Sequence, residues 1–244
     1  MCGFGDAVTT IKFLKKLKAL GFNPANILDI GAHWGRFGEH CISVFKKANI
    51  MMVEPIKYKE LKRFDYQQRF SYRNVLLDEC EQMRDWHEMR DTGDSMYKEK
   101  TRYYENCAIY KRKTTTLDVE FRGYFSSGPE LIKIDTQGAE IPILKGGKET
   151  IRNNEIIIME VPLVGSYNEN APNFSEYISY LDDAGYTPLE LLKPGAFCYR
   201  EVTKCMTDGA DFSIHTDIAF IKKGHKLLDK QQAQILELGK RTNE

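Results

Sequence analysis

The sequence has no apolar run long enough to cross a bilayer. A transmembrane helix needs about 20 consecutive apolar residues, and the apolar runs of this chain of 244 residues are all much shorter. The segment from Met1 to Asp6 also lacks the basic and apolar parts of a secretory signal. We therefore expect a soluble, unsecreted, cytoplasmic protein without a membrane span.

An excess of charge of either sign is also missing. The chain has 35 Lys and Arg residues against 35 Asp and Glu residues, so no overall field favours nucleic acid or an anionic membrane, although local patches stay open. The six cysteines lack the short paired spacings of a zinc site or a redox motif. We expect reduced thiols without a chemical role.

No repeat, low-complexity tract or linker rich in Pro, Gly and Ser divides the chain. Its length suits one large domain with a buried core. We predict a single domain over 1–244, with an amphipathic helix within 1–24 and a weaker one within 225–244. We expect the latter to dock on its own domain, and a homo-oligomer stays open.

The most informative feature present is a glycine-rich bend directly after an apolar run. The run at 27–30 is followed by Gly31, Gly35 and Gly38, and the next apolar run ends at Glu54. Glycine allows a sharp turn, and we expect its missing Cβ to leave room for a ligand. An acidic residue at the end of the second strand is suited to ribose hydroxyls. These features predict a nucleotide-type cofactor pocket.

Strand and helix patterns alternate along the chain. This alternation requires parallel strands with crossover helices, the doubly wound α/β class, whose ligands bind beyond the carboxyl ends of the strands. The predicted strands span 27–30, 50–53, 72–77, 131–135, 156–160, 186–192 and 217–222, and the predicted helices span 36–47, 57–64, a short segment ending at 145, and 174–184.

Two segments have no clean periodicity. Residues 78–113 are charged and aromatic, with a turn signal at 92–95 and a basic, tyrosine-rich stretch at 98–113. We predict an irregular excursion that acts as a solvated lid loop, with a surface that binds phosphates and rings as the alternative. Residues 193–216 are predicted to form a loop that covers the site.

The glycine spacing argues against a dinucleotide cofactor. The second glycine of the G-x-G-x-x-G fingerprint lets pyrophosphate approach the helix start, and His33 stands at that position here. Asp29, inside the first strand, is equally unfavourable for an anion. A cationic cofactor fits better: the sulfonium and amino groups of S-adenosylmethionine can face Asp29, while Glu54 accepts hydrogen bonds from the ribose.

With these residues the sequence resembles the FkbM-type S-adenosylmethionine-dependent methyltransferases. The shared pattern consists of Asp-x-Gly-Ala-x-x-Gly (Asp29, Gly31, Ala32, Gly35), Val53-Glu54-Pro55, Thr116-Leu117-Asp118, the block from Leu131 to Gly147, and Ile156 to Glu160. The resemblance spans residues 27 to 222. It implies a Rossmann-like class I methyltransferase fold with seven strands, the last one antiparallel. It also implies O-methylation of hydroxyls on sugars, glycans or small natural products.

Motif positions and strand ends together define the expected cofactor site. Asp78, which ends the third predicted strand, would meet the adenine amino group, or else stabilise a turn. His33 departs from the family, which usually has Asn there, and 78–113 and 193–216 match nothing in the family, so the acceptor is not identified. The residues assigned to cofactor binding are Asp29, Gly31, Ala32, His33, Gly35, Glu54, Asp78 and Asp135.

Three residues are candidates for catalysis at the same rim. Methyl transfer to oxygen requires donor and acceptor in line, and a base or metal that helps the hydroxyl lose its proton. Asp135 and Glu160 end neighbouring predicted strands, and His215 precedes the last strand. The alternatives are a helix-capping role for Asp135 and a divalent cation held by both carboxylates. Metal dependence stays open.

The sequence therefore predicts an S-adenosylmethionine-dependent O-methyltransferase whose partner is a carbohydrate or small-molecule acceptor. A nucleic-acid methyltransferase is favoured only by the stretch at 98–113, and neutral net charge argues against it. The remaining hypotheses are a non-catalytic module that binds the cofactor and a nicotinamide-dependent oxidoreductase on the same kind of sheet.

Overall fold

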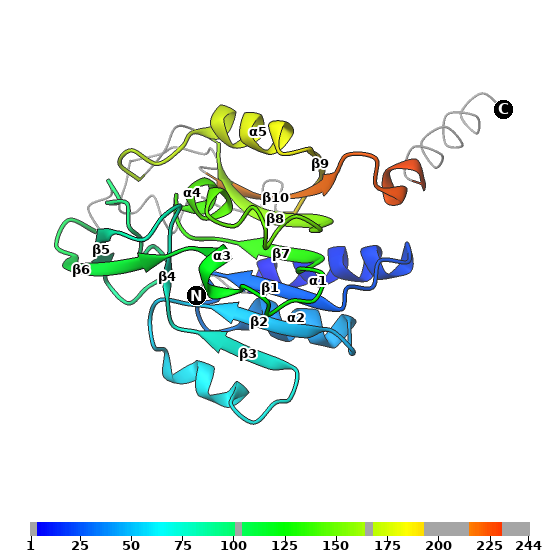
Figure 1. Cartoon of the computed structure of the whole chain (residues 1–244), viewed down its shortest axis with the longest axis horizontal. Coiled ribbons are helices and arrows are strands. Elements are labelled where there is room, and N and C mark those ends of the chain that lie inside the picture. Colours follow the sequence, from blue (N-terminus) through cyan, green and yellow to red (C-terminus); the bar gives the residue numbers. More distant parts are fainter. Residues whose placement is uncertain (1–3, 101–103, 164–167, 193–214, 231–244) are drawn as a thin grey trace.

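The computed structural model describes residues 4–100, 104–163, 168–192 and 215–230 (Figure 1). Its centre is a seven-stranded sheet in which β10 runs antiparallel to both of its neighbours and the other pairs are parallel. The order is β3 (Phe70–Arg73), β2 (Asn49–Val53), β1 (Asn26–Ile30), β7 (Leu131–Ile134), β8 (Ile156–Pro162), β10 (His215–Lys222) and β9 (Tyr186–Leu191). This confirms the predicted doubly wound sheet with an antiparallel last strand.

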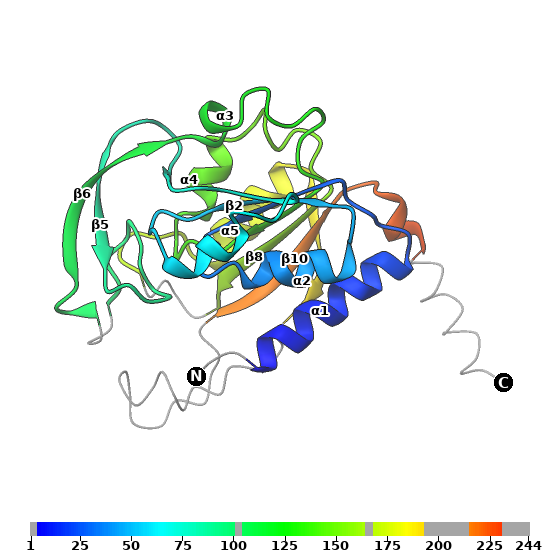
Figure 2. The same cartoon turned by 90° about the horizontal axis from the view of Figure 1, so that it is seen from below.

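Helices cover both faces of the sheet and bury two apolar cores. Helices α1 (Phe4–Ala19) and α2 (Arg36–Val44) lie together on one face (Figure 2). Helices α4 (Glu140–Lys145) and α5 (Phe174–Asp183) pack on the other face, and α3 (Leu117–Glu120) lies near α4. Because the central strands are buried on both sides, they are continuous apolar runs rather than alternating ones.

Successive residues of β1 show how the two cores are divided. Ile27 packs with α1 and α2, whereas Leu28 and Ile30 pack with α4 and α5. Asp29 shares the side of Ile27, since side chains alternate along a strand. The Asp29 carboxylate therefore points toward α1 and α2, and it is fully buried there.

The segment 78–113 differs from its prediction. It contains an antiparallel pair, β5 (Met83–Glu88) and β6 (Ala108–Thr115), and β6 also pairs with the short β4 (Leu76–Leu77). The predicted irregular excursion is therefore wrong for these strands. Trp86 and His87 are consecutive in β5 and are both buried, and β6 begins with four exposed residues. Neither strand therefore shows the alternation of apolar and polar residues that marks a half-buried strand.

Smaller differences concern the ends of elements. The predicted helix at 57–64 is a 3-10 helix, η1 (Lys59–Phe64), and the predicted strand at 72–77 is divided into β3 and β4. Most of the predicted covering loop and of the C-terminal helix lie outside the described residues. Among the helices described, none is long and apolar enough to cross a membrane.

Candidate active site

The glycine-rich bend follows β1 and is tied to the end of β2. The amides of Gly31 and Ala32 both donate to the Val53 carbonyl, at 2.9 and 3.1 Å. Gly31 has a φ of 75°, and a Cβ there would lie 1.9 Å from the backbone oxygen of Asp135. Glycine is thus required at position 31, because the ends of β1 and β7 approach each other too closely for a side chain.

The other two glycines of the motif make room for protein, not for a ligand. A Cβ on Gly35 would lie 2.6 Å from the Phe64 ring, and one on Gly38 would lie 3.1 Å from both Ile50 and Phe70. Our expectation that the missing Cβ atoms open space for a cofactor is therefore wrong at these two positions. They allow α2 to pack closely on β2, β3 and η1.

Glu54 holds the bend from the end of β2. Its carboxylate accepts hydrogen bonds from the amide of His33 at 2.8 Å and the amide of Ile56 at 2.9 Å. Burial raises the pKa of Glu54 to about 7, although these two amides act in the opposite direction. A carboxylate fixed by main-chain donors is a rigid acceptor beside the bend, as ribose hydroxyls require.

An aromatic cluster borders the same bend. The His33 ring stacks on Trp34 with centroids 4.5 Å apart and meets Tyr58 edge-on at 4.7 Å. His33 has a φ of 48°, a strained conformation of the kind that often occurs at functional sites. Burial lowers the pKa of His33, so the ring is neutral at pH 7 and forms an apolar surface near Glu54.

Asp29 lies beneath the bend and is fully buried. Neither carboxylate oxygen has a hydrogen-bond partner among the described residues. Its register partner on β7 is Lys133. Burial raises the pKa of Asp29 to about 6, and the Lys133 ammonium opposes this rise. A buried carboxylate is unfavourable unless positive charge lies nearby, and the Lys133 ammonium supplies this charge.

Asp78 has the contacts of a turn-stabilising carboxylate. It accepts hydrogen bonds from the Glu79 amide at 2.8 Å and from Gln82 Nε2 at 2.9 Å, and Arg84 Nε lies 3.5 Å away. These partners surround the start of β5. They agree with a role in stabilising the turn, and the contact of Asp78 with adenine stays a prediction.

Three strands bring the predicted catalytic residues together. His215 pairs with Pro162 at the start of β10, and its Nδ1 lies 2.5 Å from Glu160 Oε1. Gln137 Nε2 donates to both Asp135 Oδ1 and Glu160 Oε2, at 3.0 Å each. Asp135, Glu160 and His215 therefore belong to one network, and Gln137, which sequence reasoning missed, joins its two carboxylates.

Gln137 is held in an unusual backbone conformation. Its φ is 56°, and its carbonyl accepts hydrogen bonds from Ser95 Oγ and Asn168 Nδ2 at 2.8 Å each. Such strain in a residue other than glycine is sustained only where surrounding contacts fix it. The only sequence signal for this role is a long polar side chain between Asp135 and Gly138, which by itself indicates no particular partner.

Opposing charges surround the two carboxylates. Lys133 Nζ donates to Asp135 Oδ2 at 2.8 Å. Although burial acts to lower the pKa of Lys133, the nearby Asp135 and Asp29 raise it above its usual value, so Lys133 is charged. Burial raises the pKa of Glu160 to about 7; His215 opposes this rise and Asp135 adds to it. Near neutral pH the network can thus hold or release a proton.

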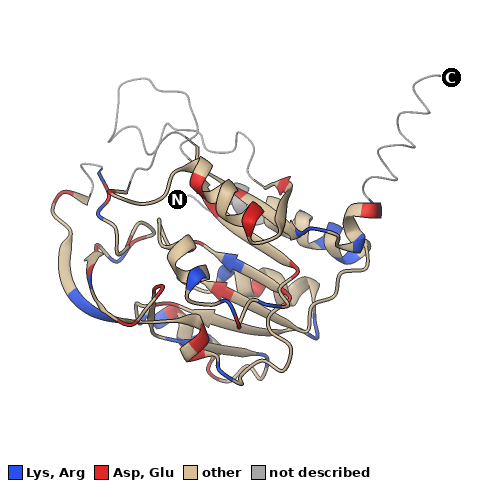
Figure 3. Cartoon of the chain, turned by 45° about the horizontal axis from the view of Figure 1, so that its top comes forward, with Lys and Arg blue, Asp and Glu red and all other residues tan. Residues whose placement is uncertain are grey.

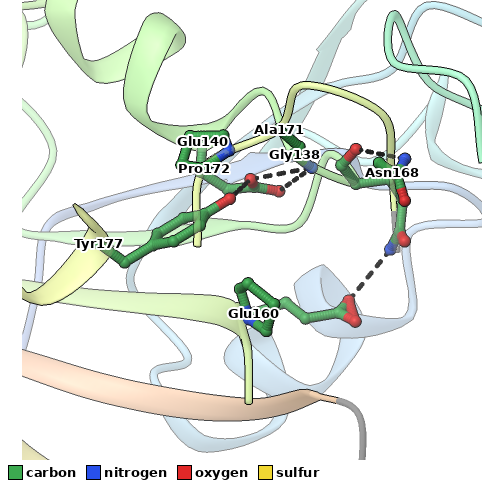
Figure 4. Close-up of a pocket in the computed structure, with 9 residues that line it drawn as sticks. Gly138, Glu140, Glu160, Asn168, Ala171, Pro172 and Tyr177 are labelled. Atoms are coloured by element: carbon green, nitrogen blue, oxygen red, sulfur yellow. Dashed lines mark hydrogen bonds between the residues drawn. The ribbon is translucent and has the colours of Figure 1, made fainter. Parts of the chain in front are cut away.

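Glu140 supports the backbone next to this network. Its carboxylate accepts hydrogen bonds from the amides of Thr136 and Gly138 at 2.7 and 3.0 Å and from the Tyr177 hydroxyl. Glu140, at the start of α4, therefore fixes the loop that carries Gln137. The loop leads into a small pocket of about 20 Å³ (Figure 4), lined by Gln137, Gly138, Glu140, Glu160, Pro162, Asn168, Ala171, Pro172 and Tyr177.

The arrangement of Asp135, Glu160 and His215 does not form a metal centre by itself. Within the described residues, no group of three or more His, Cys, Asp or Glu side chains is placed to hold a metal ion. Each of the three instead has a partner in the hydrogen-bonded network.

Acidic side chains accompany the basic residues of β6. Lys111 lies 2.8 Å from Asp85 and Lys113 lies 3.4 Å from Glu81. The basic residues of β6 form one continuous stretch (Figure 3), and their acidic partners come from β5 and the segment before it. The pairing reduces the positive potential of the segment that motivated the nucleic-acid alternative.

The sequence profile of the methyltransferase FkbM domain matches residues 29–188. This chain belongs to the FkbM methyltransferase family. The match contains the glycine-rich bend, Glu54, Asp135 and Glu160, as the resemblance implied. No curated protein matches the sequence.

Several solved structures of methyltransferases are similar to this chain at low sequence identity. A Listeria monocytogenes protein assigned as an S-adenosylmethionine-dependent methyltransferase is 12% identical, with 89% of this chain and 99% of that chain covered and a TM-score of 0.50. Burkholderia thailandensis 1,6-didemethyltoxoflavin-N1-methyltransferase, with bound S-adenosylhomocysteine, is 10% identical, with 89% and 78% covered and a TM-score of 0.46. Aeropyrum pernix fibrillarin, with bound S-adenosylmethionine, is 12% identical, with 87% and 76% covered and a TM-score of 0.47. Family and fold are thus those of S-adenosylmethionine-dependent methyltransferases, in agreement with the predicted cofactor.

Proposed function

We propose that this protein transfers the methyl group of S-adenosylmethionine to a hydroxyl of a sugar, glycan or related metabolite. The observation that carries the proposal is the pairing of two features at one edge of the sheet. Glu54 offers a fixed acceptor beside the glycine-rich bend, and Asp135 and Glu160 form a proton-accepting network on the neighbouring strands. Family membership supports the methyl transfer itself.

The residues around the bend fit the chemistry of the cofactor. Glu54 would accept hydrogen bonds from the ribose hydroxyls. The unpartnered carboxylate of Asp29 supplies negative potential beneath the bend, which favours a cationic ligand over pyrophosphate. The neutral rings of His33, Trp34 and Tyr58 offer an apolar surface for a flat base.

The remaining cofactor assignments follow from the strand ends. The backbone of Gly31 and Ala32, which forms the turn itself, would lie against the cofactor, and Gly35 would act by setting the start of α2. Asp135 would approach the cofactor from the end of β7. Asp78 is kept as a candidate for the adenine amino group.

The chain's own side chains would prepare the acceptor hydroxyl. When bound, the cofactor supplies an electrophilic methyl group on a positively charged sulfur. Asp135 would accept a hydrogen bond from the hydroxyl and take its proton, while Lys133 and Gln137 hold this carboxylate in place. Positioned bases contribute about 10²- to 10⁴-fold to such reactions, and fixed geometry adds to this.

Asp135 is a better candidate for the base than its neighbours because it is more accessible. Its side chain is 27% exposed, against 10% for Glu160 and 12% for His215. Glu160 and His215 lie behind it, joined to each other and to Gln137. We assign these two residues to the orientation of Asp135 and to the charge balance of the network during proton transfer.

Mass spectrometry of acceptors incubated with the protein and isotopically labelled S-adenosylmethionine tests the proposal. We expect a labelled methyl group on a hydroxyl of at least one neutral glycan, sugar or polyol, and loss of this product with Asp135→Asn. Cofactor binding without transfer to any member of a broad panel would instead favour the non-catalytic module. Binding of NAD in place of S-adenosylmethionine would favour the oxidoreductase.

A further inference from the structure

We propose that Ser95 is a positioning residue of the proposed active site. Its hydroxyl holds the main chain of Gln137, so that the Gln137 side chain keeps Asp135 and Glu160 joined. The inference rests on the proposed function, because it names a residue that prepares the same proton-accepting network without touching a substrate. It follows from the hydrogen bonds around Ser95 and from the strained backbone of Gln137.

The backbone of Gln137 is held from outside its own loop. Its φ of 56° is a conformation that residues other than glycine keep only where neighbouring contacts fix it. The amides on either side of Gln137 donate to Glu140 of the adjoining helix α4. The carbonyl of Gln137 instead accepts hydrogen bonds from Ser95 and Asn168, at 2.8 Å each. Residues distant in sequence therefore hold the one that joins the two carboxylates.

The Ser95 hydroxyl is oriented by its other partner. A serine hydroxyl has one proton to donate and can also accept hydrogen bonds. Here the oxygen accepts from the Tyr97 amide at 3.0 Å and donates to the Gln137 carbonyl at 2.8 Å, with the Thr136 carbonyl a more distant acceptor at 3.4 Å. Ser95 is fully buried, so water does not compete for this proton. The hydroxyl is thus directed at the main chain of the Gln137 loop.

Strand β5 places Ser95 at this position. The main chains of Ser95 and His87 pair in both directions, at 2.8 and 3.2 Å, and His87 lies in β5. The turn between them is closed by Asp94, whose carboxylate accepts hydrogen bonds from two amides of the turn. The turn signal at 92–95 in the sequence therefore brings Ser95 back beside the strand and against the Gln137 loop.

Asn168 reaches Gln137 with help from the same segment. Its side-chain amide donates to the Tyr97 carbonyl at 3.3 Å and to the Gln137 carbonyl at 2.8 Å. Residues 95–97 therefore hold the Gln137 carbonyl directly through Ser95 and indirectly through Asn168. Removal of the Ser95 hydroxyl breaks the direct link between this segment and the site.

A displaced Gln137 would release both carboxylates together. Its Nε2 carries two protons and donates to Asp135 and Glu160 at 3.0 Å each. Such a bridge depends on the position of the main chain that carries it, and small displacements of catalytic groups are costly to turnover. Asp135 keeps its bond to Lys133. We therefore expect loss of the Ser95 hydroxyl to lower turnover without abolishing it.

Hydrogen exchange of the Gln137 side-chain amide tests the position of this side chain directly. Its signals would be followed by NMR in the isotope-labelled full chain and assigned by their loss in Gln137→Ala. In Ser95→Ala we expect these protons to exchange with water at least about 5-fold faster than in the wild type, because the bridge opens more often. Unchanged exchange would overturn the inference.

Thr114→Val is the matched control for Ser95→Ala. Thr114 lies in β6 and is 1% exposed. Its hydroxyl donates to the Cys80 carbonyl at 2.8 Å and accepts from the Gln82 amide at 3.0 Å, so the variant loses the same kinds of bond in the strand beside β5. We expect Gln137 exchange within about 2-fold of the wild type. Equal acceleration in both variants would indicate general loosening and would overturn the role given to Ser95.

A double-mutant cycle on turnover separates positioning from general stability. With an acceptor that the wild type methylates, we expect Ser95→Ala to lower kcat by about 10-fold and to change the affinity for S-adenosylhomocysteine by less than about 3-fold. In the Gln137→Ala background the same substitution should change kcat by less than about 2-fold, because the bridge is already absent. A full effect in that background would overturn the inference.

The exchange measurement needs no acceptor, so its result is separate from that of the proposed function. Absence of methyl transfer by the wild type would contradict the proposed function, and the exchange rates would still decide what holds Gln137. Wild-type turnover in Ser95→Ala would contradict only the inference. Should Ser95→Ala fail to fold, Ser95→Cys keeps a weak donor of similar size, and we expect both effects at intermediate size.

Discussion

The two halves of the sheet edge are held by different kinds of hydrogen bond. Beside β2, Glu54 is fixed by the main-chain amides of His33 and Ile56. Beside β7 and β8, Asp135 and Glu160 are joined through the side chain of Gln137. Main-chain donors keep a carboxylate in one position, whereas a side-chain donor can rotate away. The first half is therefore rigid, and we call it the cofactor half because we propose that it holds S-adenosylmethionine. The second half, which we propose as the acceptor half, can exchange its partners.

The pKa values of two carboxylates show the same difference between main-chain and side-chain partners. Burial raises the pKa of both Glu54 and Glu160 to about 7. For Glu54 the opposing influence comes from backbone amides, and for Glu160 it comes from the neighbouring His215. Substitution of a neighbouring side chain should thus change the acceptor half much more than the cofactor half.

The largest expected effect is the loss of both halves when Gly31 is replaced. In Gly31→Ala the new Cβ would lie 1.9 Å from the Asp135 carbonyl, at a φ of 75°. Adding the penalties of a left-handed alanine and of overpacking, we expect the free energy of unfolding to fall by about 3–5 kcal/mol in urea titrations.

Gly123 provides the matched control for this substitution. It has a similar φ of 72°, and beyond its chain neighbours no described atom lies within 4 Å of a Cβ added there, so Gly123→Ala should cost only about 1–2 kcal/mol. Equal losses in the two variants would show that the close approach of β1 and β7 is not what requires glycine at position 31.

The next largest effect separates the two halves. Asp135→Asn removes the proposed base and should lower turnover by about 10²- to 10⁴-fold, with the affinity for S-adenosylhomocysteine changed by less than about 3-fold. The control Asp85→Asn alters an exposed carboxylate paired with Lys111 and should keep full turnover. Turnover near wild type in Asp135→Asn would exclude this residue as the base.

Glu54→Gln should produce the reverse pattern. Loss of the negative charge weakens the hydrogen bonds expected from the ribose, so we expect the affinity for S-adenosylhomocysteine to fall by about 10- to 100-fold in calorimetry. Turnover at saturating cofactor should stay within about 3-fold of wild type. A variant that binds normally but turns over slowly would move Glu54 from the cofactor half to the acceptor half.

The smallest expected effect is a pH dependence of cofactor binding. The pKa of Glu54 is raised to about 7, so its charged form, which accepts the ribose hydrogen bonds, becomes populated as pH increases. Affinity for S-adenosylhomocysteine should therefore rise by up to about 10-fold between pH 6 and pH 8. The same titration with Glu54→Gln should be flatter, and an unchanged slope would assign the dependence to another group.

The local structure of the proposed cofactor half could be predicted from the sequence because its parts are close along the chain. The apolar run of β1, the glycine-rich bend and Glu54 all lie within residues 26–54, and each has a recognisable local requirement. The main error there is the reason given for two glycines. Gly35 and Gly38 make room for protein side chains and not for a ligand.

The acceptor half was predicted only in part. Asp135 and Glu160 are visible as carboxylates at strand ends, but the role of Gln137 depends on contacts from Ser95 and Asn168. These residues are distant in sequence and bear no common motif. The meeting of such partners is decided by the packing of the whole domain.

The β5 and β6 pair was missed for a different reason. The neighbouring residues Ile109 and Tyr110 are 57% and 51% exposed, although their side chains point to opposite sides of the strand. Both sides of this part of β6 therefore meet solvent. A strand exposed on both sides gives no alternating pattern from which it could be predicted.

Calorimetric titration of S-adenosylhomocysteine into three proteins tests the central claim most directly. We predict binding to the wild type, binding weakened at least about 10-fold in Glu54→Gln, and binding within about 3-fold of wild type in Glu160→Gln. Absence of binding to the wild type, or equal weakening in both variants, would contradict the division of the edge into a cofactor half and an acceptor half.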